Sequence, residues 1–362
     1  MNAFADSFAA LNNAYGEPII TGVLRQSPED FVVEEILGFE PEGEGEHVFL
    51  WIEKRGSNTQ FVADKIAKFS GVAAKQVSFS GMKDRWAVTR QWFSVQLPGM
   101  ADPDWALLND EEITVLKSQR HLRKLRRGVH RGNRFRLTLR EVDGDLDALK
   151  IRVAEIAKSG VPNYFGEQRF GRGFSNMSSA VRWFEGAFKP RRNQQSLFLS
   201  AARSFIFNEL LSARVAADNW CQALTGELFM LNGSHSIFAS NEPDMHNRMS
   251  TADVHATGPM YGKPGSLRVS DQVADLEQQI VERYPVLTQG LLAQGLKAER
   301  RSLRLMPENL QVNYLPDQQA LVFDFALASG SFATAVLAEM VDYRNVATPA
   351  TSAITNSGRE NR

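Results

Sequence analysis

The stretch RFRLTLREV, residues 134–142, alternates between polar and apolar side chains over its first seven positions. In an extended chain, Phe135, Leu137 and Leu139 share one face, and the arginines and Thr138 share the other. This alternation predicts a strand with one buried face and one exposed face. The sequence on either side of this strand contains patterns for further strands and for helices.

More strands are predicted before this stretch, at residues 19–24, 31–36, 46–54, 77–79, 87–97 and 113–117. Two helices are predicted in the same part of the chain. One begins after the N-cap residue Asn58 and ends at Gly71, and the other runs from Asp145 to Lys158 and is closed by Gly160. Residues 1–16 are expected to form a loose arm.

The middle of the chain favours helices, with helical spacing at residues 176–187, 197–217 and 271–284 and a loop at 241–263. Strand patterns return at 310–314 and 320–327. A helix is predicted at 332–343, and the polar tail 345–362 is expected to be disordered. The chain is therefore predicted to be an α+β protein in which a mixed-sheet domain is interrupted by an inserted, mainly helical domain.

The composition is that of a folded protein, with 43% hydrophobic residues and 23 Phe among 362 residues. A single cysteine, Cys221, allows no intramolecular disulfide and no zinc cluster built on cysteines. The first ten residues have no basic segment of the kind that begins a signal peptide. The apolar stretch 325–338 is shorter than the roughly 20 residues that a membrane-spanning helix needs. We expect a cytoplasmic protein that does not enter the membrane.

Charge is separated along the chain although the formal net charge is only −1. Residues 29–46 contain eight acidic and no basic residues, whereas residues 117–136 contain nine Lys and Arg and no acidic residue. The basic segment includes Arg123, Lys124, Arg126, Arg127 and Arg131. Such a protein can present a strongly positive face to nucleic acid.

Asp84 is the first candidate for chemistry, in the segment GMKDRWAVTRQ at residues 81–91. It lies between Lys83 and Arg85, at the predicted end of one strand and before the next. Neighbouring cations favour an ionised carboxylate, which can act as a nucleophile or base. From spacing alone, an ordinary solvated Lys-Asp-Arg turn explains the same residues.

Two further segments suit contacts with RNA. In RGNRF, residues 131–135, Asn133 has an amide that can pair with a base edge and Phe135 a ring that can stack on a base. A solvated basic strand with Phe135 in the core is the alternative. The segment 161–173, which contains Arg169, combines glycines, aromatic rings and arginines; it equally suits a hinge between domains. The histidines show no metal-binding spacing, so no metal site is predicted.

The chain resembles the TruD family of tRNA pseudouridine synthases in its bacterial form. The similarity runs from about residue 23 to residue 343, and its motifs occur in the order SPEDFVVEEI (27–36), GMKDRWAVTRQ (81–91), RGNRF (131–135), VPNYFGEQRFG (161–171), ARSFIFN (202–208) and SGSFATAVLAEM (329–340). The resemblance implies a catalytic pseudouridine synthase domain formed by residues 1–158 and 306–362, and an inserted TRUD-type domain formed by residues 159–305.

The resemblance also implies roles for particular residues. It makes Asp84 the catalytic nucleophile and places Phe31, Asn133 and Phe332 in contact with the substrate. Phe135 matches the ring that stacks on the target base. Many members carry Lys where this chain has Arg25, and we expect Arg25 to form the ion pair with Asp84. RNA phosphates are expected on Arg123, Lys124, Arg126, Arg127, Arg131 and Arg169.

The function implied is the isomerisation of a uridine of tRNA, uridine-13 by resemblance, to pseudouridine. The reaction is neither a redox reaction nor a phosphoryl transfer, so no cofactor is predicted. The expected partner is tRNA, and we expect a monomer without protein partners. Two alternatives stay open: a non-catalytic tRNA-binding protein or RNA chaperone, and a metal-dependent nuclease, which would need several converging carboxylates.

Overall fold

The computed structural model describes residues 3–240 and 242–346, which form two compact units. The sheet unit consists of residues 21–144 and 311–324 together with the strand residues from Asp342. The helical unit consists of the residues up to Ile20, residues 145–310 and residues 325–341. Four segments of the predicted catalytic domain pack with the helical unit: the N-terminal segment and residues 145–158, 306–310 and 325–341.

The largest sheet has the strand order β14-β15-β7-β2-β5-β3-β6. β2 pairs in parallel with β5 and antiparallel with β7, and β3 is antiparallel to both β5 and β6, so the sheet is mixed. β4 pairs with β5, and β1 pairs with β7 and β16. The strand bounds are β1 (Ile20–Leu24), β2 (Phe31–Ile36), β3 (His47–Arg55), β4 (Val77–Phe79), β5 (Val88–Gln96), β6 (Ile113–His121), β7 (Gly132–Gly144), β14 (Glu308–Leu315), β15 (Ala320–Ala328) and β16 (Val341–Asn345).

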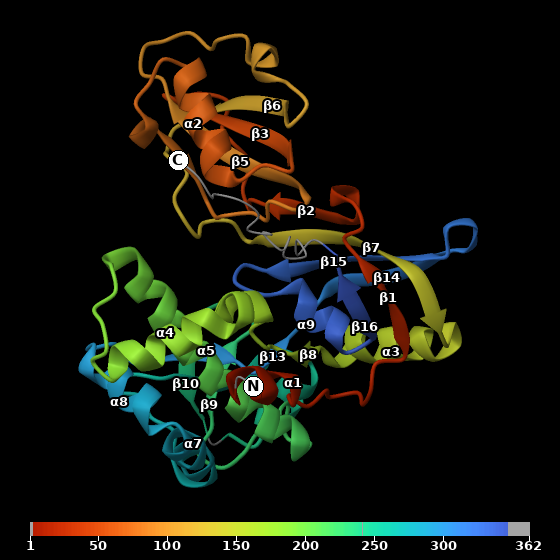
Figure 1. The fold of residues 1–362 in the computed structure, drawn as a ribbon, viewed down its shortest axis with the longest axis vertical. Helices are drawn as coiled ribbons and strands as arrows, with labels where there is room; N and C mark the ends of the chain where they lie inside the picture. The colour runs from red at the N-terminus through yellow and green to blue at the C-terminus, as the bar shows by residue number, and fades with distance from the viewer. Residues whose placement is uncertain (1–2, 241, 347–362) are drawn as a thin grey trace, which may run out of the picture. The chain divides into compact units, whose positions relative to one another are not determined.

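Helix α2 (Thr59–Phe69) covers one face of β3 and β5 in the sheet unit (Figure 1). Val62 and Ile66 of this helix are fully buried in one cluster with Leu50 and Phe93 of the strands. Each such side chain stabilises the fold by about 1.5–3 kcal/mol. The predicted cap is confirmed, because the Asn58 side chain accepts a hydrogen bond from the Phe61 amide at 2.8 Å.

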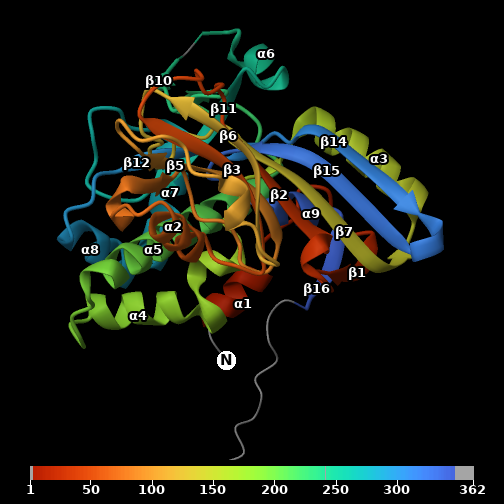
Figure 2. The ribbon, with the colours of Figure 1, turned by 90° about the horizontal axis from the view of Figure 1, so that it is seen from above.

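The helical unit is built around the long helix α5, which α4 and α7 flank (Figure 2). It also holds a four-stranded sheet in the order β10-β9-β11-β12 and a two-stranded pair, β8 with β13. The bounds are α3 (Leu146–Ser159), α4 (Ser175–Phe184), α5 (Arg192–Ala216), α6 (Met245–Ser250), α7 (Asp271–Arg283), α8 (Pro285–Ala293), α9 (Ala333–Ala338), β8 (Val161–Pro162), β9 (Leu228–Leu231), β10 (Ile237–Ala239), β11 (Val254–Met260), β12 (Glu299–Ser302) and β13 (Arg304–Leu305).

The expectation of a loose N-terminal arm was wrong for the described part of that segment. Helix α1 (Ala3–Ala9) packs on the core of the helical unit. The Phe4 ring meets the Phe205 ring edge-on at 5.1 Å, and the Phe8 ring lies 5.6 Å from that of Phe170. Phe4 and Phe8 are four residues apart, so they share one face of the helix. The packing of these partly buried rings orders a segment whose sequence is otherwise weakly patterned.

Two other segments were also predicted wrongly. The loop predicted at 241–263 contains α6 and β11, and β11 is held by pairing with β9 and β12. The helix predicted at 332–343 ends at Ala338, and β16 follows from Val341 because it pairs with β1. Of the predicted tail, Asn345 ends β16, and residues 347–362 lie outside the described residues. Within the described ranges, no helix is long and apolar enough to cross a bilayer.

Candidate active site

Asp84 lies in the irregular segment between β4 and β5, and its side chain is 23% exposed. The carboxylate oxygen Oδ1 accepts a hydrogen bond from the Trp86 amide at 3.1 Å. The backbone carbonyl of the same residue accepts a hydrogen bond from Lys54 Nζ at 2.8 Å. Both the side chain and the backbone of Asp84 are therefore held in place, and part of the carboxylate remains open to a ligand.

Arg25 forms the ion pair with Asp84 that the sequence predicted. Its Nη2 lies 2.8 Å from Asp84 Oδ2, and only 7% of the Arg25 side chain is exposed. The guanidinium lies over the Phe31 ring at 3.7 Å from the ring centroid. Cation–π contact and burial fix the guanidinium, so that a second charged group is presented beside the carboxylate.

The two cations that flank Asp84 in sequence have other partners. Lys83 Nζ lies 3.0 Å from Glu35 Oε2 and 2.8 Å from Asn133 Oδ1. Arg85 Nε donates to the carbonyl oxygen of Gly56 at 3.1 Å. The argument from neighbouring charges therefore named the wrong cations, because the cation paired with the carboxylate comes from residue 25.

Lys83 also determines how Asn133 is oriented. An ammonium group has donors only, so the atom at 2.8 Å from Lys83 Nζ must be the amide oxygen of Asn133. Lys83 is itself held by Glu35, whose side chain is fully buried. The Asn133 amide nitrogen is left as a donor, and a donor suits the carbonyl oxygens of uracil.

Phe135 and Phe31 lie side by side on neighbouring strands, with centroids 6.4 Å apart in an edge-to-face arrangement. Phe135 is buried on the same face of β7 as Leu137 and Leu139, as the alternation predicted. The predicted stacking of Phe135 on a base remains a prediction. Through Phe31 and Arg25, the ring belongs to the same chain of contacts as Asp84.

Lys54 is a residue of this site that sequence reasoning missed. It is fully buried, and its ammonium donates to the carbonyl oxygens of Ser57 at 2.6 Å and Asp84 at 2.8 Å. Burial lowers its pKa to about 8, although the charge of Asp84 acts in the opposite direction. A signal was present in the sequence, because Lys54 continues the buried alternation of Leu50 and Ile52 in β3.

Glu35 was missed as well. Its carboxylate accepts hydrogen bonds from Ser80 Oγ at 2.6 Å and from the Trp92 amide at 3.3 Å, in addition to its contact with Lys83. It shares the buried face of β2 with Phe31 and Val33. The sequence did contain a signal, because a charged residue follows Phe31 and Val33 on the side of the strand that is buried. A charged residue at such a position indicates a buried ion pair.

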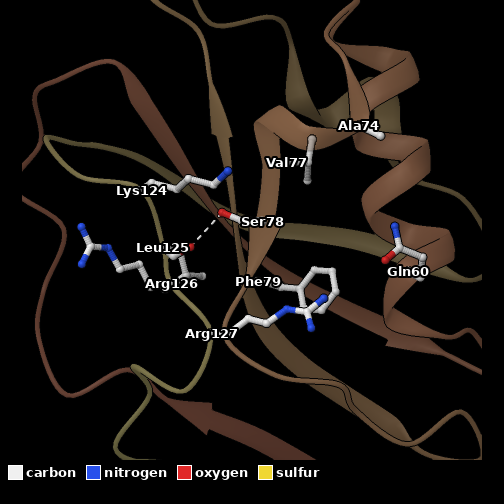
Figure 3. Close-up of a pocket in the computed structure, with 9 residues that line it drawn as sticks. All are labelled: Gln60, Ala74, Val77, Ser78, Phe79, Lys124, Leu125, Arg126 and Arg127. Carbon is white, nitrogen blue, oxygen red and sulfur yellow. Dashed lines mark hydrogen bonds between the residues drawn. The ribbon is translucent and has the colours of Figure 1, made fainter. Parts of the chain in front are cut away.

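The central part of the basic segment, residues 122–131, forms an irregular stretch between β6 and β7. Leu125 is buried, while the cationic side chains around it are exposed: Arg123, Lys124, Arg126, Arg127 and Arg131. A pocket of about 350 Å³ lies beside this stretch, lined by three of these cations and by Gln60, Ala74, Val77, Ser78, Phe79 and Leu125 (Figure 3). None of these lining residues is acidic, so the pocket suits an anion.

The two remaining predicted residues, Phe332 and Arg169, lie together in the helical unit. Phe332 precedes α9, and its ring lies 5.8 Å from that of Phe165. The Arg169 guanidinium is 5.5 Å from the Phe332 ring centroid. The residues predicted to bind substrate or RNA thus divide between the units: Phe332 and Arg169 lie in the helical unit, and the others lie in the sheet unit. Among the described residues, no group of three or more His, Cys, Asp or Glu side chains could hold a metal ion.

The fold is shared with a crystal structure of a Methanosarcina mazei protein that has been assigned as tRNA pseudouridine synthase D (TruD). The TM-score is 0.71 at 21% identity, over 94% of this chain and 98% of the other. The arrangement of helices and strands in this chain therefore has a solved precedent.

Sequence comparison gives the family. A family model described as tRNA pseudouridine synthase D (TruD) matches residues 12–179 and 174–340. The tRNA pseudouridine synthase D of Hydrogenovibrio crunogenus is 45% identical, over 91% of this chain and 96% of that protein. The protein of the same name from Xanthomonas axonopodis pv. citri is 46% identical, over 92% of this chain and 94% of that protein. The chain belongs to the tRNA pseudouridine synthase D (TruD) family.

Proposed function

We propose that this protein isomerises a uridine of tRNA to pseudouridine, with Asp84 as the carboxylate that starts the reaction. The observation that carries the proposal is the partly exposed Asp84 carboxylate in its 2.8 Å ion pair with Arg25, in a chain of the TruD family. The names of the relatives give tRNA as the substrate. We extend the proposal to uridine-13, the position implied by the family resemblance. We also propose that residues 159–305 act as a domain inserted into a catalytic domain of residues 1–158 and 306–362.

The chemistry needs no electron donor or acceptor. The bond from ribose C1′ to uracil N1 breaks, the base turns, and C5 bonds to C1′; the proton lost from C5 is balanced by one gained at N1. A carboxylate can start this sequence by bonding to C1′ or C6 or by taking the ribose 2′ proton. Each route needs an accessible carboxylate oxygen at Asp84, and the ion pair with Arg25 fixes the orientation of that carboxylate.

The base must leave the RNA stack to reach Asp84, at a cost of a few kcal/mol. Stacking on an aromatic ring recovers about 1–3 kcal/mol per base, and we assign that role to Phe135. Phe31 and Phe332 complete the proposed contacts with the substrate. The Asn133 amide nitrogen donates to a uracil carbonyl, because Lys83 engages the amide oxygen.

RNA phosphates are proposed to bind the exposed cations beside the pocket of Figure 3. These are Arg123, Lys124, Arg126, Arg127 and Arg131, and Arg169 adds a contact from the helical unit. The absence of an acidic side chain among the pocket's lining residues supports this assignment. Because cations displace counterions from RNA, affinity should fall as salt rises.

Mapping of pseudouridine in an unmodified tRNA transcript, with and without the protein, tests the proposal. We expect one new pseudouridine, at position 13, in the sample with protein and none in the control. Pseudouridine at another single position would refute the assignment to uridine-13 alone. Tight tRNA binding without any pseudouridine would favour the non-catalytic RNA-binding alternative.

A further inference from the structure

Two arginines of the helical unit share one aromatic ring. The Arg301 guanidinium, from β12, lies 4.1 Å from the centroid of the Phe165 ring, and the Arg169 guanidinium lies 5.3 Å from the same centroid. Arg169 also lies over Phe332, at 5.5 Å. Two positive charges are therefore gathered around a pair of phenylalanine rings that themselves meet edge to face.

Within the described part of the chain, the recorded hydrogen bonds of both guanidinium groups go to neutral acceptors. Arg301 Nη2 donates to Asn163 Oδ1 at 2.5 Å, and its Nη1 donates to the carbonyl oxygen of Gly330 at 3.2 Å. Arg169 Nη1 donates to Ser200 Oγ at 3.1 Å, and its buried Nε has no partner among the described residues. Neither side chain has a salt bridge to a carboxylate in those residues.

This arrangement carries an electrostatic cost that Arg248 of the same unit avoids. Burial lowers the pKa of Arg169, and burial together with the charge of Arg169 lowers the pKa of Arg301 to about 9. By contrast, Arg248 lies over the Phe238 ring at 5.7 Å, and its Nε pairs with Asp253 at 2.6 Å. An anion between Arg169 and Arg301 would balance their positive charges, as the Asp253 carboxylate balances the charge of Arg248.

The backbone around the two arginines is closely packed. A Cβ atom at Gly166 would lie 2.8 Å from Thr334 Oγ1, so the loop that carries Phe165 and Arg169 approaches the start of α9 too closely for a larger residue. Arg301 ties the same region together through Asn163 and Gly330. The two charges are thus held on a fixed support, which lowers the entropy lost when an anion binds.

We propose that Arg169 and Arg301 form an anion site that takes a phosphodiester group of the RNA beside Phe332. The identity of the anion rests on the proposed function, whereas the existence of the site does not. A guanidinium presents a planar set of donors that matches the oxygens of a phosphate. Phe332 is then positioned to contact the nucleotide next to that phosphate.

The first experiment uses inorganic phosphate as the probe and needs no RNA. Thermal unfolding of the full chain is followed at increasing phosphate, with chloride at equal ionic strength as the reference. We expect phosphate to raise the wild-type midpoint, and Arg169→Gln to weaken the apparent phosphate affinity by at least about 10-fold. Arg248→Gln is the matched control, because its charge is already paired with Asp253, and it should respond as wild type does.

The second experiment measures tRNA binding between 50 and 200 mM salt. Arg169→Gln should weaken binding and reduce the slope of log K against log salt by about one, the change expected for one lost phosphate contact. Arg248→Gln should leave the slope unchanged. Arg169→Lys, which keeps the charge, should retain most of both responses, and circular dichroism verifies that each variant is folded.

Equal responses of wild type and Arg169→Gln to inorganic phosphate would overturn the site. A lost phosphate response with an unchanged tRNA salt slope would overturn its assignment to RNA. A response in both experiments, in a protein that forms no pseudouridine, would leave the anion site standing and refute the proposed function. The two proposals therefore fail separately.

Discussion

The Arg25 region of the sheet unit and the Arg301 region of the helical unit both place a guanidinium over a phenylalanine ring, and they differ in how the charge of the arginine is balanced. In the sheet unit, Arg25 lies 3.7 Å from the Phe31 centroid and pairs with the Asp84 carboxylate. In the helical unit, Arg301 lies 4.1 Å from the Phe165 centroid, and it shares that ring with the cationic Arg169. We propose that the same contact serves two purposes: the paired arginine fixes the carboxylate that starts the reaction, and the arginine without a carboxylate partner among the described residues binds a phosphate.

Apart from removal of the Asp84 carboxylate itself, the largest effect should follow from unbalancing the first region. Arg25→Met removes the ion pair, so the Asp84 carboxylate loses its cation and part of its fixed orientation. We expect single-turnover pseudouridine formation to slow by about 100-fold, since a small misplacement of a reacting group has an effect of that order. Arg25→Lys should recover most of the rate, because an ammonium restores the charge.

The control for this variant is the affinity for tRNA, which should fall far less than the rate because the exposed cations proposed to bind the phosphates are unchanged. A rate for Arg25→Met equal to that of wild type would contradict the view that the ion pair positions the carboxylate.

An intermediate effect is expected for Lys54, which fixes the backbone of Asp84. Its pKa is lowered to about 8, so the ammonium is lost as pH rises through that value and the rate should decline there. Below pH 8, Lys54→Met should form pseudouridine roughly 10-fold more slowly than wild type, because Asp84 is then less well positioned. Its rate should not decline as pH rises through 8. Full pH–rate profiles of both proteins check the prediction, and an identical alkaline decline in the variant would assign it to another group.

The same shift sets the sign of a stability effect. The unfolded chain keeps the Lys54 proton up to the ordinary pKa of 10.5, whereas the folded chain loses it near 8. The unfolded state therefore binds more protons between these values, and this residue makes the free energy of unfolding rise with pH over that range. Lys54→Met should remove that rise, which urea titrations at several pH values would detect.

The smallest effect is expected for an exposed ion pair in the sheet unit. Arg134 donates to both carboxylate oxygens of Asp324, at 2.8 and 2.9 Å, but its side chain is 57% exposed. Asp324→Asn should lower the free energy of unfolding by less than about 1 kcal/mol. Its pseudouridine rate should stay within about twofold of wild type on the same grounds. A large loss of rate here would mean that removing any ion pair of this sheet slows the reaction, which would weaken the argument from Arg25.

The parts of the fold that follow from local sequence were predicted, and those that depend on distant contacts were not. Helix α2 and strand β7 were found because a cap at Asn58 and an alternation around Phe135 are local signals. Helix α1 was missed because its order comes from Phe4 packing on Phe205, some two hundred residues away in sequence. The first three residues of strand β16 were taken for helix because its pairing with β1 leaves no local trace.

The candidate site divides in the same way. The pairing of Arg25 with Asp84 was predicted through the family resemblance, since no spacing rule joins residues so far apart. Lys54 and Glu35 were missed, although each lies at a position where the alternation along its strand places side chains in the interior. Lys83 was misjudged, because sequence proximity suggested that it serves Asp84, while the fold directs its ammonium to Glu35 and Asn133.

The account depends most on the carboxylate at residue 84, and a single substitution tests it. Asp84→Asn keeps the size of the side chain and removes its charge, and its single-turnover rate of pseudouridine formation in tRNA can be compared with that of wild type at saturating protein. We predict a loss of at least roughly 1000-fold, as for a group that acts in the chemical step, with tRNA affinity preserved. A variant that still forms pseudouridine at a rate within about tenfold of wild type would contradict the central claim, because the loss would then be far below that of a group acting in the chemical step.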